Sequence, residues 1–283
     1  MAYLITGSTG IIGSLVTERL IVRGLLPRIF VRDAAKALAR YGDHAEIHSG
    51  DLSDAASLSR ALAGVDVLFL VNSGPELAAL DAIAADAAKT AGVKRLVKLS
   101  SYDAREQNVG TGVWHAAGEA AIREGGVPFV FVQPSGFMSN ALYWAQSIKQ
   151  DGLLRSATGH GKIPFIHPAD IADVAVEALI RPDYIGESLA ITGPEALSYP
   201  EMGAIIGAVI NKDVRFQEIS EREARTQQTA WNTPPALAEA RLSIFRAIRE
   251  GRLAKVTDTV EKVLGRKPIR FEQWARDNAA SFG

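Results

Sequence analysis

Three evenly spaced glycines lie between the first apolar run, Tyr3–Thr6, and a helix-like stretch at about residues 11–23. They belong to the segment Gly7-Ser8-Thr9-Gly10-Ile11-Ile12-Gly13. Glycines placed in this way allow a tight turn, close approach of the backbone to a bound group, and close packing of the helix on a sheet. The unpaired N–H groups that begin such a helix favour an anion such as a pyrophosphate. The segment therefore predicts a dinucleotide-binding turn, and the alternative is a turn that needs glycine only for its own backbone.

Apolar runs alternate with helix-like stretches along the first two thirds of the chain. The further runs are Arg28–Val31, Ala45–His48, Val65–Val71, Arg95–Leu99 and Pro128–Val132, and the stretches between them are 34–41, 54–63, 76–91 and 113–125. Continuously apolar runs are typical of parallel strands covered on both faces. The pattern predicts an α/β fold, a Rossmann-like doubly wound parallel sheet with a smaller, interwoven C-terminal α/β substrate lobe. We expect a core at residues 1–150 and a lobe mostly at 151–283, with a segment at about 163–192 returning to the core.

Composition excludes several classes of function. The 283 residues carry 31 Lys and Arg against 32 Asp and Glu, which argues against an electrostatic nucleic-acid binder. The chain has no cysteine and its five histidines lack metal-ligand spacing, so we expect no metal. No apolar run approaches the ~18 residues of a membrane span, and the first residues do not resemble an export signal. We therefore expect a cytoplasmic protein with no membrane partner.

The end of the second strand indicates which dinucleotide would bind. Arg32 follows that strand and could form a fork on a 2′-phosphate, and Lys36 would add a second positive charge. Asp33 could instead hold the ribose diol, as acidic residues do at this place in NAD-binding proteins. We expect NADP rather than NAD, although both cations could also be ordinary solvated charges.

Polar residues follow three further strands. Asp51-Leu52 comes after the third, Asn72-Ser73 after the fourth, and Ser100 with Tyr102 after the fifth. Open α/β sheets bind ligands at the carboxyl ends of their strands, so these residues are candidates for contact with the cofactor. Each could individually be a helix cap or a loop residue.

These segments resemble the NmrA-like branch of the atypical short-chain dehydrogenases/reductases, within it most closely the NAD(P)H:quinone oxidoreductases and NAD(P)H azoreductases. The resemblance covers nearly the whole chain. It depends on Thr6–Gly13, Val31–Asp33, Gly50–Leu52, Ala91–Lys94, His115–Val127 and Gly161–Ala172. It implies a reductase that uses NAD(P)H.

The resemblance also shows what is missing. Short-chain dehydrogenases normally use a Tyr-x-x-x-Lys couple, and the corresponding positions here are Thr111 and His115. The resemblance implies that His115 lies near the nicotinamide ribose, with Glu119, one helical turn later, orienting its ring. The alternative is a solvated His–Glu pair. Tyr102 is a candidate substitute acid, and otherwise a pocket wall or turn residue.

The absence of the Tyr-x-x-x-Lys couple restricts which hydride acceptors the protein could reduce. Hydride addition to a simple ketone leaves an alkoxide-like anion, whose conjugate acid has a water-like pKa of about 15.7 and which needs a proton donor. Addition to a quinone leaves a phenolate-like anion, whose conjugate acid resembles tyrosine with a pKa of about 10. The difference corresponds to about 8 kcal/mol that the protein need not supply. We therefore expect a quinone or another conjugated electrophile.

The loop after the sixth strand is the candidate substrate side. The resemblance puts Pro134, Ser135, Gly136 and Phe137 beside the nicotinamide. A flat apolar wall could be formed by Phe137, Met138, Tyr143 and Trp144. At helical spacing such residues are also common as plain core.

The sequence therefore predicts an oxidoreductase that transfers hydride from NADPH to a small aromatic or quinone substrate without flavin or metal. One alternative is a non-catalytic sensor of the NADP(H) redox state. Another is a tailoring reductase for a polycyclic quinone or an imine. The sequence leaves a homodimer open.

Overall fold

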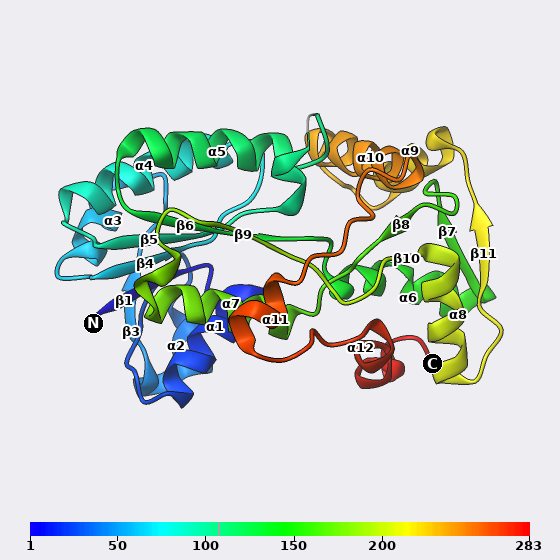
Figure 1. The fold of residues 1–283 in the computed structure, drawn as a ribbon, viewed down its shortest axis with the longest axis horizontal. Coiled ribbons are helices and arrows are strands. Elements are labelled where there is room, and N and C mark those ends of the chain that lie inside the picture. Colours follow the sequence, from blue (N-terminus) through cyan, green and yellow to red (C-terminus); the bar gives the residue numbers. More distant parts are fainter. Residues whose placement is uncertain (107) are drawn as a thin grey trace. The chain divides into compact units, whose positions relative to one another are not determined.

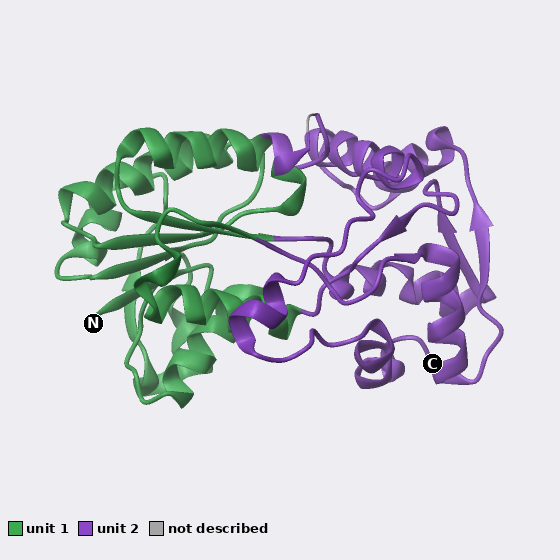
Figure 2. Ribbon diagram, in the orientation of Figure 1, with its two compact units in different colours: residues 1–104, 114–133, 168–189 green, residues 105–113, 134–167, 190–283 purple. Residues whose placement is uncertain are grey.

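The computed structural model describes residues 1–106 and 108–283, which divide into two units (Figures 1 and 2). Unit 1 consists of residues 1–104, 114–133 and 168–189, and unit 2 of residues 105–113, 134–167 and 190–283. This division differs from the expected boundary near residue 150. The chain already enters unit 2 at Pro134, because the segment that follows packs into the hydrophobic core of that unit through Met138 and Trp144.

A seven-stranded sheet organises unit 1, in the order β3-β2-β1-β4-β5-β6-β9. The strands are β1 (Tyr3–Thr6), β2 (Arg28–Val31), β3 (Glu46–Ser49), β4 (Val67–Leu70), β5 (Arg95–Leu99), β6 (Phe129–Pro134) and β9 (Ser188–Ile191). Neighbours from β3 to β6 are parallel, and Ile5 of β1 lies opposite Ile29 of β2 and Phe69 of β4. The strand order reverses at β1 and β4, which is where a doubly wound sheet binds its ligand. The predicted fold class is confirmed.

Helices cover both faces of this sheet (Figure 1). They are α1 (Ile11–Val22), α2 (Ala34–Tyr41), α3 (Ala55–Leu62), α4 (Leu77–Thr90), α5 (Gly112–Gly125) and α7 (Pro168–Ile180), with the short η1 (Gly42–His44), η2 (Tyr102–Arg105) and η4 (Pro182–Tyr184). On one face α3, α4 and α5 bury apolar side chains of the strands, among them Leu4, Leu68 and Phe131. Asp54 starts α3 by accepting the N–H groups of Ala56 and Ser57.

Unit 2 contains two small sheets, in which β7 pairs with β11 in parallel and β8 pairs with β10 antiparallel. Its elements are η3 (Met138–Trp144), α6 (Ala145–Asp151), β7 (Leu153–Ser156), β8 (Lys162–Ile163), β10 (Leu197–Ser198), α8 (Tyr199–Ile210), β11 (Arg215–Glu218), α9 (Glu221–Ala230), α10 (Pro235–Arg249), α11 (Thr259–Leu264), α12 (Phe271–Asp277) and η5 (Ala279–Ser281). The rings of Trp144, Phe165 and Tyr199 pack against one another in its core.

The sequence also predicts a helix near residues 136–149, and the structure has two shorter elements there, η3 and α6. A backbone pairing that a helix would not allow holds the start of this segment. Ile166 donates its N–H to Gly136 and accepts the N–H of Met138, both at 2.9 Å. The segment is therefore held in an extended form before the helix begins.

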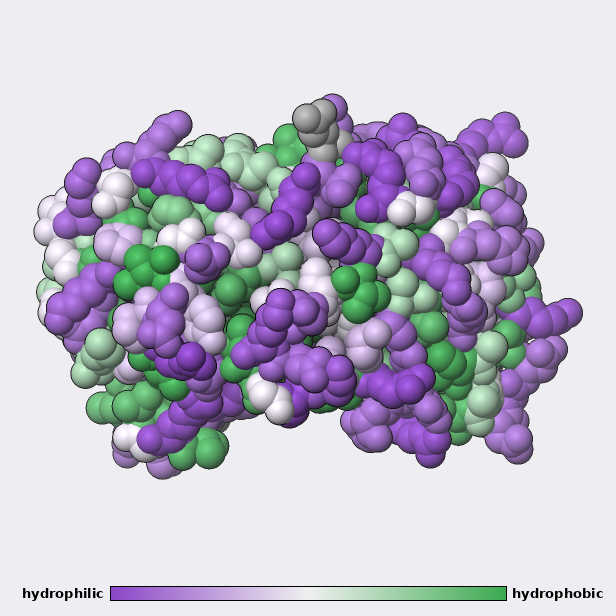
Figure 3. All heavy atoms as spheres, viewed as in Figure 1, coloured by the Kyte–Doolittle hydropathy of each residue, from purple (hydrophilic) through white to green (hydrophobic). Residues whose placement is uncertain are grey.

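The surface drawn in Figure 3 mixes hydrophilic residues with small groups of apolar ones. Among the described residues, no helix is long and apolar enough to cross a membrane. The cytoplasmic location stays a prediction.

Candidate functional site

The turn between β1 and α1 has room for glycine alone at two of its three glycine positions. Gly7 has φ +64°, and a Cβ there would lie 2.9 Å from the Cβ of Val71. A Cβ at Gly13 would collide with the carbonyl of Gly7. The loop therefore folds tightly back on the first turn of α1, as the sequence predicts.

Gly10 leaves the start of α1 open to a ligand. It is exposed, no side chain caps the helix, and the first turn has no acidic residue. A Cβ at Gly10 would meet one atom within 4 Å, the carbonyl oxygen of Gly7 at 3.3 Å, which is a tight contact that a small shift can relieve. Unpaired N–H groups and the positive end of a helix dipole fit a diphosphate at this point.

A buried tyrosine, which the sequence analysis missed, supports this loop. Tyr41, the last residue of α2, donates its hydroxyl to the carbonyl of Ser8 at 2.5 Å. Burial raises the pKa of the Tyr41 phenol, so it remains a donor at neutral pH. Ser8 is also buried, and Thr9 is half-buried. The contact joins residues 33 positions apart, and no local sequence motif predicts it.

The end of β2 presents two unpaired cations. Arg32 and Lys36 are exposed, and neither has an ion-pair partner among the described residues. Asp33, the alternative ligand for a ribose, caps α2 by accepting the N–H of Lys36 at 2.9 Å. Asp51, after β3, accepts two hydrogen bonds from Ser53, which lower the pKa of its carboxyl, and Arg32 lowers it further. Arg32 and Asp51 therefore share one edge of the sheet.

A buried ion pair lies behind the ends of β4 and β5. Lys98 of β5 and Asp81 of α4 are fully buried, and their charged groups are 2.5 Å apart. Asn72, after β4, donates to the other oxygen of Asp81 at 2.7 Å. The backbone of Gly118 packs so closely on Asp81 that a Cβ there would collide with the carboxylate. Neither charged residue was predicted, although a lysine inside the apolar strand Arg95–Leu99 was a usable signal.

His115 is on α5 next to this pair. Its Nδ1 is buried and has no hydrogen-bond partner among the described residues. Burial, and then repulsion from the ammonium of Lys98, lowers the pKa of His115 to about 3. The imidazole is therefore neutral at physiological pH.

The expected contact between His115 and Glu119 is not present among the described residues. The buried carboxylate of Glu119 instead accepts hydrogen bonds from Ser100 at 2.5 Å and Gln133 at 2.7 Å, and it faces Arg123 at 3.4 Å. The i, i+4 spacing does put both residues on α5. Ser100, directly after β5, and Gln133 of β6 bind the carboxylate instead, and the local i, i+4 pattern does not reveal these donors.

The other predicted residues of this edge differ in exposure. Tyr102 is buried at the start of η2, whereas Ser73 is exposed. Leu52 is half-buried. In α1, Ile11 is exposed and Ile12 is buried.

The predicted substrate loop belongs to unit 2. Pro134 ends β6, Ser135 donates its hydroxyl to the carbonyl of Pro164, and a Cβ at Gly136 would lie 2.5 Å from the ring of Phe165. Half-buried Phe137 forms an isolated bridge with Ile166. The loop is thus held in place by its contacts with residues 164–166.

The expected apolar wall divides into buried and exposed members. Met138 is fully buried and Trp144 nearly so, both in the core of unit 2, which favours the alternative of core residues for these two. Tyr143 is 55% exposed.

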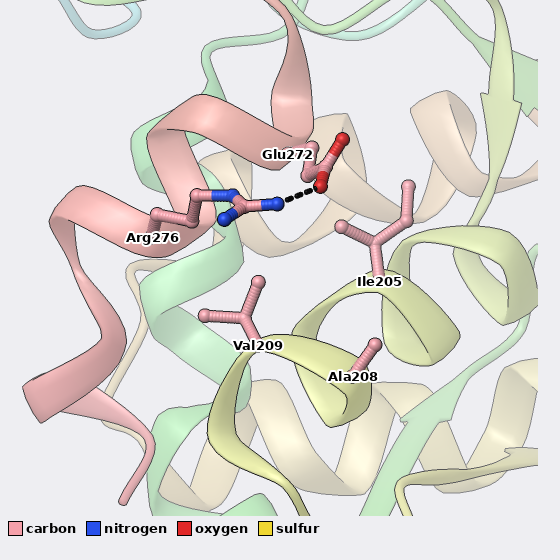
Figure 4. A pocket seen from close by; sticks show the side chains of 5 residues that line it. All are labelled: Ile205, Ala208, Val209, Glu272 and Arg276. Carbon is pink, nitrogen blue, oxygen red and sulfur yellow. Dashed lines mark hydrogen bonds and ion pairs between the residues drawn. The ribbon is translucent and has the colours of Figure 1, made fainter.

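A separate hollow of about 260 Å³ lies in unit 2 between α8 and α12 (Figure 4). Its apolar floor is formed by Ile205, Ala208 and Val209, and the ion pair of Glu272 with Arg276 borders it. It includes none of the predicted site residues. Across residues 1–106 and 108–283, no cluster of three or more His, Asp or Glu side chains could hold a metal ion.

Known proteins match this chain along its whole length. A protein named NAD(P)H azoreductase from Xenophilus azovorans is 38% identical over 283 residues, covering 99% of both chains. A (4-alkanoyl-5-oxo-2,5-dihydrofuran-3-yl)methyl phosphate reductase from Streptomyces griseus is 37% identical and covers 99% of this chain and 98% of its own.

A solved structure shares the fold. The NADPH-dependent quinone oxidoreductase of Escherichia coli, in complex with NADPH, superposes with a TM-score of 0.90 at 24% identity, over 98% of this chain and 99% of that one. The model of the NmrA-like family matches residues 2–273. This chain belongs to the NmrA-like family.

Proposed function

We propose that the protein is an NADPH-dependent reductase that transfers hydride to a quinone or a similar conjugated electrophile, without flavin or metal. The observation that carries the proposal is the turn at residues 7–13, which leaves the start of α1 uncapped and accessible at Gly10. Relatives named as reductases, at 38% and 37% identity over the whole chain, support it.

The residues at the sheet edge fit a cofactor with a 2′-phosphate. NADPH, when bound, supplies a hydride from its nicotinamide ring and leaves as NADP⁺. The uncapped N-terminus of α1 would hold the diphosphate, and Arg32 with Lys36 would hold the 2′-phosphate. Asp33 is engaged as the cap of α2, which favours NADPH over NADH.

The chain's own groups would bind and orient rather than donate protons. Reduction of a quinone to a hydroquinone needs one hydride and one proton, and water can supply the proton because the intermediate anion resembles a phenolate. His115, with a pKa of about 3, carries no extra proton at neutral pH. Its role would be to present a neutral imidazole beside the ribose, held by burial.

Gly10→Val tests the cofactor site. The valine side chain would fill the space in front of α1, while φ −91° at this position suits any residue, so the fold should persist. We expect NADPH binding by calorimetry to disappear, while circular dichroism and the melting temperature stay near those of the wild type. Unchanged affinity in a folded variant would exclude this turn as the site.

Arg32→Ala tests the choice between dinucleotides. We expect NADPH to bind about tenfold to a hundredfold more weakly, from a loss of ~1–3 kcal/mol, while NADH binding changes little. An equal loss for both cofactors would contradict a 2′-phosphate contact.

Turnover tests the reaction itself. We expect the wild type to oxidise NADPH with benzoquinones and naphthoquinones, and far more slowly with a simple ketone such as cyclohexanone. A protein that binds NADPH tightly but oxidises it with none of these acceptors would be a sensor rather than a reductase.

A further inference from the structure

An arginine of unit 2 stacks on a solvent-facing tyrosine ring, which in turn stacks on a tryptophan ring. Arg241 of α10 lies over the ring of Tyr143, 4.8 Å from its centroid, and donates to the Tyr143 hydroxyl at 3.1 Å. The Tyr143 ring stacks on that of Trp231, with centroids 6.2 Å apart and planes inclined by 21°. Tyr143 is 55% exposed and Trp231 is 47% exposed. We call these three residues the aromatic–arginine cluster.

The guanidinium of the cluster has only neutral partners. Besides Tyr143, it donates to Gln228 at 3.0 Å and to Thr233 at 3.5 Å. No carboxylate lies within ion-pair distance of it among the described residues. Gln228 is itself buried, so the guanidinium is held in place while its charge remains uncompensated.

Neighbouring arginines show the contrast. Arg225 of α9 pairs with Glu239, and Arg246 of α10 pairs with Glu221. The two helices lie side by side (Figure 1). Carboxylates are thus available on both helices, and yet none is placed against Arg241.

Tyr143 of the cluster belongs to the segment that the sequence predicts as the substrate side. Tyr143 is in η3, the segment that begins directly after Phe137. Ser243, also on α10, accepts the N–H of Gly110 at 2.7 Å, and the segment from Gly110 runs on to His115. Ser243 of α10 therefore holds the backbone of Gly110 within unit 2.

Stacked aromatic rings bind flat aromatic bodies, and a fixed guanidinium forms a fork on carboxylate, sulfonate or phosphate oxygens. We propose that the aromatic–arginine cluster determines acceptor specificity, binding the aromatic body of an acceptor that carries an acidic substituent. This inference depends on the proposed reductase function. It adds the substrate class, which is planar aromatic acceptors with a negative charge.

A matched pair of acceptors tests the proposal, a naphthoquinone sulfonate and the same naphthoquinone without the sulfonate. In Arg241→Met we expect the KM for the sulfonate to rise about tenfold with kcat nearly unchanged, and the KM for the neutral quinone to stay within about twofold. Arg241→Lys should recover part of the loss, since it restores the charge without the fork. Trp231→Ala should raise the KM for both acceptors, because it removes stacking surface.

Arg225→Met is the matched control, since it removes an exposed arginine that already has a carboxylate partner. It should leave both KM values unchanged, and NADPH affinity should be the same in all variants. Equal effects of Arg241→Met on the two acceptors, or none on either, would overturn the proposal.

Binding without turnover separates failure of this inference from failure of the proposed function. A naphthalene sulfonate, titrated against wild type and Arg241→Met by calorimetry, needs no reaction. If the wild type reduces no quinone but binds this probe through Arg241, the reductase proposal fails and the binding surface stands. If it reduces quinones but the probe binds both proteins equally, the cluster has no part in recognition.

Discussion

Unit 1 and unit 2 differ in whether their charged side chains are buried. The buried charged side chains of the described residues all lie in unit 1, and they are Asp81, Arg95, Lys98, Asp103, Glu119 and Asp170. In unit 2 the buried polar side chains are uncharged, and the arginine that stacks on Tyr143 is half-buried. A buried and paired charge positions its neighbours, whereas a solvent-accessible charge without a counter-charge can bind an ionic ligand.

The buried pair of unit 1 illustrates the first role. Burial raises the pKa of Asp81 and lowers that of Lys98, and their mutual attraction opposes both shifts. The positive charge that this attraction retains on Lys98 disfavours a proton on His115. The pair therefore helps to keep the imidazole neutral.

Lys98→Met should have the largest effect on stability. It leaves the carboxylate of Asp81 buried without its counter-charge, so we expect the free energy of unfolding to fall by about 3–5 kcal/mol. Chemical denaturation measures this loss. The double variant Lys98→Met with Asp81→Asn should recover much of it, because Asn keeps an acceptor for Asn72 and carries no charge.

Lys162→Met is the control for this comparison. Lys162 forms an exposed pair with Glu201 at 2.8 Å, and solvent screens such pairs, so its loss should change stability by less than about 1 kcal/mol. Similar losses in the buried and exposed variants would show that burial does not distinguish the two pairs.

His115→Gln should have an intermediate, pH-dependent effect. The folded protein keeps this imidazole neutral down to about pH 3, whereas the unfolded chain protonates it below about pH 6.5. The unfolded state then binds more protons, so wild-type stability falls as the pH drops through this range. Between about pH 6.5 and 4.5 the variant should lose about 2 kcal/mol less than the wild type.

Denaturation at several pH values measures the difference. His44→Gln, a change at an exposed histidine, is the control. Parallel pH profiles for His115→Gln and the wild type would mean that the buried imidazole titrates alike in both states.

The sequence predicted the sheet of unit 1 almost residue by residue. The bounds of β1, β2 and β5 agree with the expected runs, since continuous apolar segments between glycine stops leave little freedom. The prediction that a helix begins near residue 136 was wrong, because the pairing of Gly136 and Met138 with Ile166 is a long-range contact. The turn at residues 7–13 was recognisable because its glycine spacing is local, whereas its contacts with Val71 and Tyr41 were not predicted.

The candidate site was only partly predictable. Motifs identified Arg32, Asn72, Ser100 and His115, which stay predictions as site residues. Their partners come from other elements, as Asp81 of α4 does for Asn72 and Glu119 of α5 for Ser100. Spacing along the chain cannot show such pairs, and so the sequence suggested Glu119 as the partner of His115.

Arg225→Gln should have the smallest effect and sharpens the contrast between the units. Arg225 pairs with Glu239, and both side chains are about half exposed. We expect the free energy of unfolding to change by less than about 1 kcal/mol at low salt. The difference should vanish near 1 M salt, where the screening length is about 3 Å. A loss that persists at high salt would mean that unit 2 depends on this surface pair as unit 1 depends on Lys98, and the distinction between positioning charges and available charges would fail.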